Sequence, residues 1–180
     1  IQYNFPTIVL FGENSITELP YRIDILGLKN CMLVTDSGLV SVGIVEQFKT
    51  VFEGTLIKLN IFSDVHANPI EEDIVNGVQS FKDNNCDCII ALGGGSPMDV
   101  GKTIRFMAVH KFPLSQYDDT IEGDKLIINK MPPLFAVPTT AGTGSEVGRC
   151  SVITLKSTGR KTIFFHPNLI PDIAILDPQL

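Results

Sequence analysis

The chain has 180 residues, of which 44% are hydrophobic and 19% charged, with a formal net charge of -6. This length suits one α/β domain with a substantial core and is too short for two ordinary domains. The acidic balance and the scattered basic residues argue against a nucleic-acid partner. The sequence has no run of about 18 apolar residues and no signal-peptide pattern, so we expect no membrane span and a cytoplasmic location.

Short apolar runs alternate with helical patterns along the chain. We expect strands at residues 7–11, 31–35, 55–62, 89–92, 134–137 and 173–176, and a β-hairpin at 150–155 and 161–165. Helices are expected from Asn14 or Ser15 to about Leu26, over 38–52, from Pro69 to about 81, and from Ser96 to about 109. Residues 112–130 are expected to form a surface loop.

Most of these runs are apolar throughout, which is typical of parallel strands covered by helices on both faces. The more polar run at 55–62 indicates a strand near a sheet edge. We therefore predict a Rossmann-like α/β fold: an open, mostly parallel sheet with helices on both faces and a β-hairpin near the C-terminus. One domain is expected over residues 1–180.

Three glycines, Gly93, Gly94 and Gly95, follow the run at 89–92. Ser96 then suits an N-cap and Pro97 the first helical position, so a helix should begin there. At a helix N-terminus, backbone N–H groups that no side chain covers can bind the phosphates of nucleotides. The alternative is that the glycines only close a tight turn.

Neither common nucleotide motif fits this turn. A G-x-G-x-x-G fingerprint is missing and would normally occupy the first βα turn of its domain. Gly101-Lys102-Thr103 matches the end of a P-loop, but Ser96 stands where its first glycine is required. We therefore predict a phosphate-binding turn of a third kind.

Two other strand ends carry polar groups. Asp36 follows the run at 31–35 and could accept hydrogen bonds from a ribose 2′-hydroxyl, or it could simply cap the next helix. The run Thr139-Thr140-Ala141-Gly142-Thr143-Gly144-Ser145-Glu146 follows the strand at 134–137; it is either a ligand-binding loop or an ordinary turn. Because the carboxyl ends of parallel strands meet at one sheet edge, these segments should share a crevice with the glycine turn.

Cysteine and histidine spacing gives no metal motif. Cys31, Cys86, Cys88 and Cys150 form no CxxC pair, so buried thiols are expected and neither a disulfide framework nor a zinc knuckle is indicated. The three histidines, at positions 66, 110 and 166, are isolated in the sequence, without an acidic partner at ligand spacing.

Several segments together resemble the iron-containing (group III) alcohol dehydrogenase family, which shares an ancestral fold with glycerol dehydrogenase and dehydroquinate synthase. They are VTDSGLVSVG, the Asn68-Pro69 loop, GGGSPMDVGK, PTTAGTGSEV and PDIAILDPQL. The resemblance implies that NAD lies in the cleft between a dinucleotide-binding domain and a helical domain. It also implies that the metal ligands, one Asp and three His, belong to the helical domain expected after residue 180, so no ligand for iron or zinc is expected in this chain.

The resemblance also implies roles for particular residues. Gly94, Gly95 and Ser96 would hold the pyrophosphate, and Asp99 would support this turn. Asp36 would contact the adenosine ribose and favour NAD over NADP.

Further implied contacts lie along the rest of the coenzyme. Asn68 would line the adenosine end. The cleft side facing adenine, pyrophosphate or nicotinamide would be formed by Thr139, Thr140 and Thr143. The wall beside the nicotinamide ribose would be completed by Val152, Lys161 and Leu180.

The implied chemistry is reversible hydride transfer between a small alcohol or aldehyde and NAD, with the metal as Lewis acid. These 180 residues alone are expected to be inactive. The alternatives are a dehydroquinate synthase-like or glycerol dehydrogenase-like enzyme domain, or a stand-alone nucleotide-binding module of P-loop type. A homodimer could form by pairing of an edge strand near Thr7 or of the hairpin.

Overall fold

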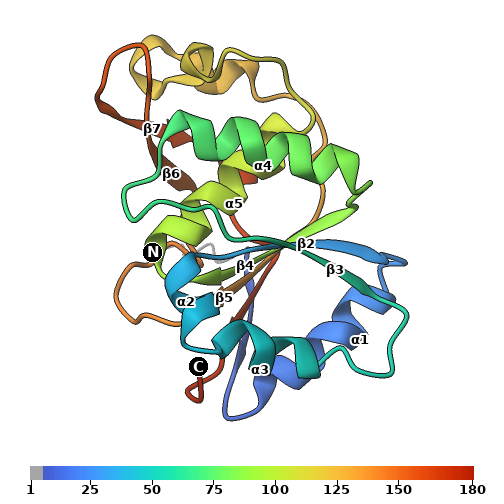
Figure 1. Ribbon diagram of the computed structural model, residues 1–180. Coiled ribbons are helices and arrows are strands. Elements are labelled where there is room, and N and C mark those ends of the chain that lie inside the picture. Colours follow the sequence, from blue (N-terminus) through green and yellow to red (C-terminus); the bar gives the residue numbers. More distant parts are fainter. Residues whose placement is uncertain (1–5) are drawn as a thin grey trace, which may run out of the picture.

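The computed structural model describes residues 6–180 and contains a six-stranded sheet (Figure 1). Its strands are β1 (Ile8–Phe11), β2 (Asn30–Val34), β3 (Lys58–Phe62), β4 (Cys88–Gly93), β5 (Leu134–Pro138) and β8 (Ile173–Leu176). They lie in the order β1-β8-β5-β4-β2-β3, and every neighbouring pair is parallel. The predicted Rossmann-like fold is confirmed, and β3 occupies a sheet edge as its polarity indicated.

Helices cover both faces of the sheet (Figure 1). One face carries α1 (Leu19–Asp24), α2 (Ser37–Ser41) and α3 (Ile44–Thr50), and the other carries α4 (Glu71–Asp83) and α5 (Gly95–Met107). The alternation of side chains along a strand explains how one apolar run serves both cores. In β4, Ile89 and Ala91 pack on the α4 and α5 side, whereas Ile90 and Leu92 pack on the other.

An antiparallel hairpin, β6 (Cys150–Thr154) and β7 (Lys161–Phe165), packs beside α5, as predicted. The connection at 112–130 was expected to be a surface loop, which is only partly right. It contains the 3-10 helices η2 (Leu114–Tyr117), η3 (Asp119–Ile121) and η4 (Gly123–Leu126). Its Leu114, Tyr117 and Ile127 side chains are buried, because they cover the outer side of the α5 core.

Two of the predicted helices are interrupted. The first begins as a 3-10 turn, η1 (Ser15–Glu18), before α1. The helix expected over 38–52 is instead split into α2 and α3, because Gly43 adopts a left-handed conformation with φ of 83°. A residue in that conformation cannot continue a right-handed helix.

The starts of α4 and α5 also differ from the prediction. Pro69 lies before α4, whose N-cap is Ile70, and the side chain of Asp73 accepts the Ile70 amide at 3.1 Å. The N-cap of α5 is Gly94 rather than Ser96. The Ser96 hydroxyl instead donates to the Ala67 carbonyl at 2.8 Å, which ties α5 to the loop after β3.

A buried guanidinium holds the opposite end of the sheet. Arg105 donates to the carbonyls of Pro132, Asn168 and Ile170 and pairs with Asp172 at 2.6 Å. Burial lowers the pKa of Arg105, and the charge of Asp172 opposes this. Among residues 6–180, no helix is both long and apolar enough to cross a lipid bilayer.

Candidate functional site

A cavity of about 690 Å³ lies at the carboxyl ends of four strands. It is lined by residues that follow β2, β3, β4 and β5, chiefly at 36–39, 65–67, 94–97 and 139–140. The chain leaves β2 toward α2 on one face and leaves β4 toward α5 on the other, so this is a topological switch point. Open α/β sheets bind their ligands at such points. The predicted convergence of Asp36, the glycine turn and Thr139 is confirmed.

The first residue of the glycine turn has a backbone conformation that a side chain would disrupt. Gly93 has φ of 143°, and a Cβ there would lie 2.7 Å from Pro97 Cγ and 3.2 Å from Leu39 Cδ1. No side chain caps α5, so backbone N–H groups of its first turn are left to other partners. A 13-residue helix also brings the positive end of its dipole to this turn. Together these features suit an anionic ligand.

The two following glycines face the threonine-rich loop. A Cβ at Gly94 would lie 3.4 Å from Thr140 Oγ1, and a Cβ at Gly95 would lie 3.7 Å from Thr143 Cβ. Larger side chains would therefore fill the gap between the glycine turn and this loop. The absence of side chains at 94 and 95 leaves room for phosphate oxygens to reach the backbone, so these residues fit the implied dinucleotide.

The threonine-rich loop is braced from behind by α5. The Ser145 hydroxyl donates to Asp99 Oδ1 at 2.6 Å, and the Val152 amide donates to Asp99 Oδ2 at 3.1 Å. The fully buried Lys102 donates to Ser145 Oγ at 2.8 Å and to the Cys150 carbonyl at 2.9 Å. Asp99 therefore supports the threonine-rich loop through Ser145 and the hairpin through Val152.

Burial has the largest effect on the pKa values of Asp99 and Lys102. It raises the pKa of Asp99, while Ser145, Lys102 and the Val152 amide oppose the rise. It lowers the pKa of Lys102, and the charge of Asp99 opposes the fall. The Lys102 ammonium is turned toward protein partners rather than the cavity, and the Thr103 hydroxyl contacts the Asp99 carbonyl and Ser151. The geometry of Gly101-Lys102-Thr103 thus does not support a P-loop.

Asp36 both caps a helix and lines the cavity, the two alternatives that its sequence position allowed. Its Oδ1 accepts the Leu39 amide at 3.0 Å and caps α2. It also lines the cavity together with Gly94 and Gly95. Capping therefore holds the carboxylate in place at the cavity wall.

Asn68 and Lys161 were expected at different ends of the coenzyme. In the structure, Lys161 Nζ donates to Asn68 Oδ1 at 2.7 Å. The two side chains are therefore in contact with each other, and their assignment to different parts of the coenzyme stays a prediction. The hairpin brings Lys161 over the loop after β3, a contact that sequence spacing does not reveal.

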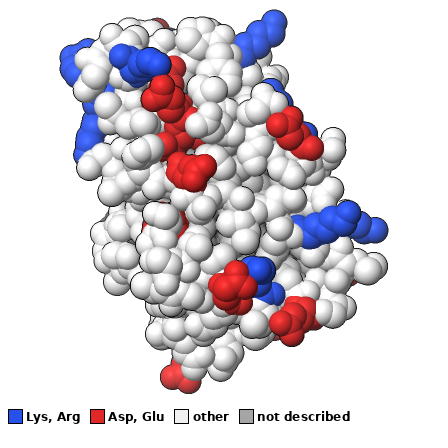
Figure 2. Space-filling view, in the orientation of Figure 1, with Lys and Arg blue, Asp and Glu red and all other residues white. Residues whose placement is uncertain are grey.

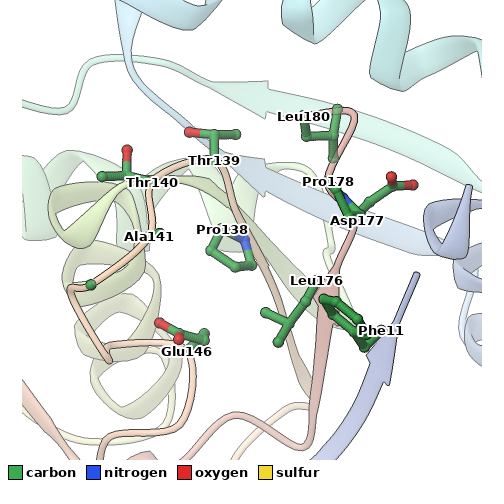
Figure 3. Close-up of a pocket in the computed structure, with 11 residues that line it drawn as sticks. Phe11, Pro138, Thr139, Thr140, Ala141, Glu146, Leu176, Asp177, Pro178 and Leu180 are labelled. Atoms are coloured by element: carbon green, nitrogen blue, oxygen red, sulfur yellow. The ribbon is translucent and has the colours of Figure 1, made fainter. Parts of the chain in front are cut away.

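A second cavity of about 470 Å³ adjoins the threonine-rich loop (Figure 3). Thr139 and Thr140 line both cavities, so the two are neighbours. Its wall is mainly apolar and includes Phe11, Leu176 and Leu180. Figure 3 shows Leu180 on the side opposite Thr140 and Ala141. The predicted site residue Leu180 thus faces the loop that holds the predicted threonines.

Sequence reasoning missed one pair at the first cavity. His66 lines that cavity, and its Nδ1 lies 2.6 Å from Asp73 Oδ1. In the sequence, His66 has no acidic partner at ligand spacing, but the fold brings Asp73 to it. The two residues are seven positions apart and meet only because the chain turns at Asn68-Pro69 before entering α4.

Potential metal ligands gather elsewhere in the part of the chain that the structure describes. The one group of three within 4.8 Å is Cys31, Asp87 and Cys88, at the amino ends of β2 and β4. The two sulfur atoms lie 3.0 Å apart. The hydrogen bond to Cys31, and then burial, raise the pKa of Cys88, and the group lies at the end of the sheet opposite the first cavity. Burial also raises the pKa of Cys86 to about 11.

The other two histidines serve packing and capping. His110 Nδ1 bonds the Phe106 carbonyl, and its Nε2 accepts the Ile128 and Asn129 amides. His166 Nδ1 accepts the Asn168 amide at the start of η5 (Pro167–Leu169). On the face drawn in Figure 2, several basic side chains lie together at the upper left beside acidic ones, and the others are separate.

Comparison with known proteins gives consistent matches over the whole chain. A family model described as iron-containing alcohol dehydrogenase matches residues 6–178. The 1,3-propanediol dehydrogenase of Citrobacter freundii is 37% identical over 180 residues, covering 99% of this chain and 46% of that protein.

Solved structures agree with the sequence comparison. The crystal structure of a 1,3-propanediol oxidoreductase superposes with a TM-score of 0.89 at 36% identity, covering 99% of this chain and 46% of that one. The sulfoacetaldehyde reductase from Bifidobacterium kashiwanohense in complex with NAD+ gives a TM-score of 0.85 at 29% identity, with the same coverage. The chain thus spans about half the length of these relatives.

Proposed function

Because the chain belongs to the iron-containing alcohol dehydrogenase family, we propose that it forms the NAD-binding part of an NAD-dependent alcohol dehydrogenase. The observation that carries this proposal is the cavity at the switch point, where an uncapped helix N-terminus and two bare glycines face a threonine-rich loop. NAD supplies the hydride acceptor for oxidation of an alcohol. The residues of this chain bind and orient it.

We place the coenzyme by the chemistry of each wall. The diphosphate lies on the backbone of Gly94–Ser96, and the adenosine ribose lies at Asp36. The nicotinamide reaches the threonine-rich loop and the apolar cavity beside Leu180. Asn68 lines the adenosine end and Lys161 the nicotinamide ribose, although the two side chains contact each other. A small alcohol or aldehyde would meet the nicotinamide from this side.

The family name implies iron, with zinc as the alternative metal. Within residues 6–180, the group of Cys31, Asp87 and Cys88 lies at the amino ends of β2 and β4, remote from the coenzyme cavity at the carboxyl ends of the strands. We therefore derive no step through a metal from these residues. We further propose a cytoplasmic location and a homodimer paired along β1, a sheet-edge strand whose Ile8 and Phe11 are exposed.

Asp36 provides the sharpest test of this proposal. Calorimetric titration should show that the protein binds NADH, ignores ATP with magnesium, and binds NADPH at least about tenfold more weakly, because Asp36 repels a 2′-phosphate. Asp36→Ser keeps a helix cap but removes the charge, so it should narrow the preference for NADH over NADPH.

Asp64→Ser is the matched control, because Asp64 is an exposed acid near the cavity but is not part of its lining. It should leave the preference unchanged. Tight binding of ATP with magnesium and none of NADH would favour the P-loop alternative. An unaltered preference in Asp36→Ser would remove Asp36 from the ribose site.

A further inference from the structure

The cavity that suits a diphosphate has an unusual charge balance. Among the described residues 6–180, no Lys or Arg lines it, and the only titratable lining residues are Asp36 and His66. A dinucleotide brings further negative charge to this place. Among the lining side chains, His66 is therefore the one that can carry a positive charge, while Lys161, which donates to Asn68 on the same loop, lies outside the lining.

The structure holds His66 in a defined orientation. Asp73, which is 2% exposed, contacts His66 Nδ1 through Oδ1 and accepts the amides of His66 and Ile70 through Oδ2. A carboxylate in this position favours the tautomer with the hydrogen on Nδ1 and leaves Nε2 to other partners. The His66 side chain is 63% exposed.

The same loop brings His66 to the start of α5. Ala67, the next residue, accepts the Ser96 hydroxyl through its carbonyl at 2.8 Å. His66 and the glycine turn therefore line one cavity from adjacent walls. A diphosphate bound on the first turn of α5 would lie within the space that His66 also faces.

We propose that His66 is the cationic contact of the coenzyme diphosphate, and that its Nε2, when protonated, donates a charge-assisted hydrogen bond to a phosphate oxygen. This inference rests on the proposed function. Since histidine gains its charge as pH falls from about 8 to about 5, and the bound diphosphate favours the charged form, coenzyme affinity rises as pH falls.

The ionisable groups that face His66 from α4, from its own loop and from the wall after β2 are acidic, whereas Lys161 of the hairpin reaches the same loop and donates to Asn68 Oδ1 at 2.7 Å. Asp73 faces it from α4, Asp64 lies two residues away on its own loop, and Asp36 lies at the cavity wall after β2. The walls after β4 and β5 contribute only uncharged residues to the lining. Replacing His66 should therefore remove the pH dependence that we expect for coenzyme binding at this cavity.

The test is a calorimetric titration of NADH at pH 8 and pH 6. The original protein should bind NADH about five- to tenfold more tightly at pH 6, the change expected from one charge-assisted hydrogen bond. His66→Gln should bind equally at both values, near the affinity of the original protein at pH 8. His166→Gln, the same replacement at a histidine outside the cavity, should keep the full pH effect.

Adenosine, which lacks the diphosphate, serves as the second probe and should show no pH effect. An equal gain at pH 6 in His66→Gln, or an equal gain for adenosine, would overturn the diphosphate contact while leaving NAD binding intact. Failure of the original protein to bind NADH at either pH would overturn the proposed function itself, and this inference with it.

Discussion

Replacing Gly95 by valine should lower the affinity for NADH at least about tenfold without unfolding the protein. Gly95 is the first residue of α5 and has an ordinary φ, and a Cβ there would meet Thr143 only at contact distance, 3.7 Å. The fold can therefore accept the side chain. The valine methyl groups would instead occupy the gap through which phosphate oxygens reach the backbone.

Two measurements separate these effects. Calorimetry gives the affinity, and the thermal unfolding midpoint without ligand should stay close to that of the original protein. Gly95→Ala, which adds one methyl group, should give an intermediate loss. NADH binding by Gly95→Val at the original affinity would show that the diphosphate does not lie between this turn and the threonine-rich loop.

Replacing Lys102 by methionine should cost about 3 kcal/mol of stability, because one partner of a buried polar network is removed. Methionine fills much of the same volume, but the Cys150 carbonyl and Ser145 lose their donor. Asp99 also loses its nearest cation, whose Nζ lies 4.0 Å away. The threonine-rich loop should loosen, and NADH affinity should fall with it.

Urea unfolding measures this loss. Lys156→Met is the matched control, because Lys156 pairs with Glu72 on the surface and its removal should leave the urea midpoint nearly unchanged. A midpoint for Lys102→Met equal to that of the original protein would show that the ammonium does not brace the loop.

The contact between Asp99 and Lys102 predicts how the stability of an Asp99→Asn variant changes with pH. Burial lowers the pKa of Lys102 and Asp99 opposes this, so Asp99→Asn should lower that pKa further. A lysine with a depressed folded pKa contributes stability above its unfolded value of 10.5, and this stability is lost as pH falls through the folded pKa. Asp99→Asn should therefore regain stability, relative to the original protein, as pH rises from 7 toward 10. Parallel stability profiles would contradict the account.

The sheet could be predicted well because its signal is local. An apolar run such as 89–92 is buried on both faces, and its length and composition indicate a strand without knowledge of its neighbours. Helix ends were less accurate, since they depend on single backbone conformations. Gly43 splits one helix, and the side-chain bond from Ser96 to Ala67 removes Ser96 from the expected cap.

Site residues that directly follow a strand could be predicted from the sequence. Contacts that only the tertiary fold creates could not. Asp36 and the glycine turn follow strands directly, so their convergence needed only a parallel sheet. The pairing of His66 with Asp73 depends on how the chain enters α4, and that of Lys161 with Asn68 depends on where the hairpin packs. Sequence spacing contains neither arrangement.

The central claim is that the first turn of α5 binds the coenzyme diphosphate through its backbone. A crystal structure of the protein with NADH tests it most directly. We expect diphosphate oxygens about 3 Å from the backbone nitrogens of Gly95 and Ser96, with the adenosine ribose at Asp36. A diphosphate bound away from this turn, with the cavity at the carboxyl ends of β2 and β4 left to solvent, would contradict the account.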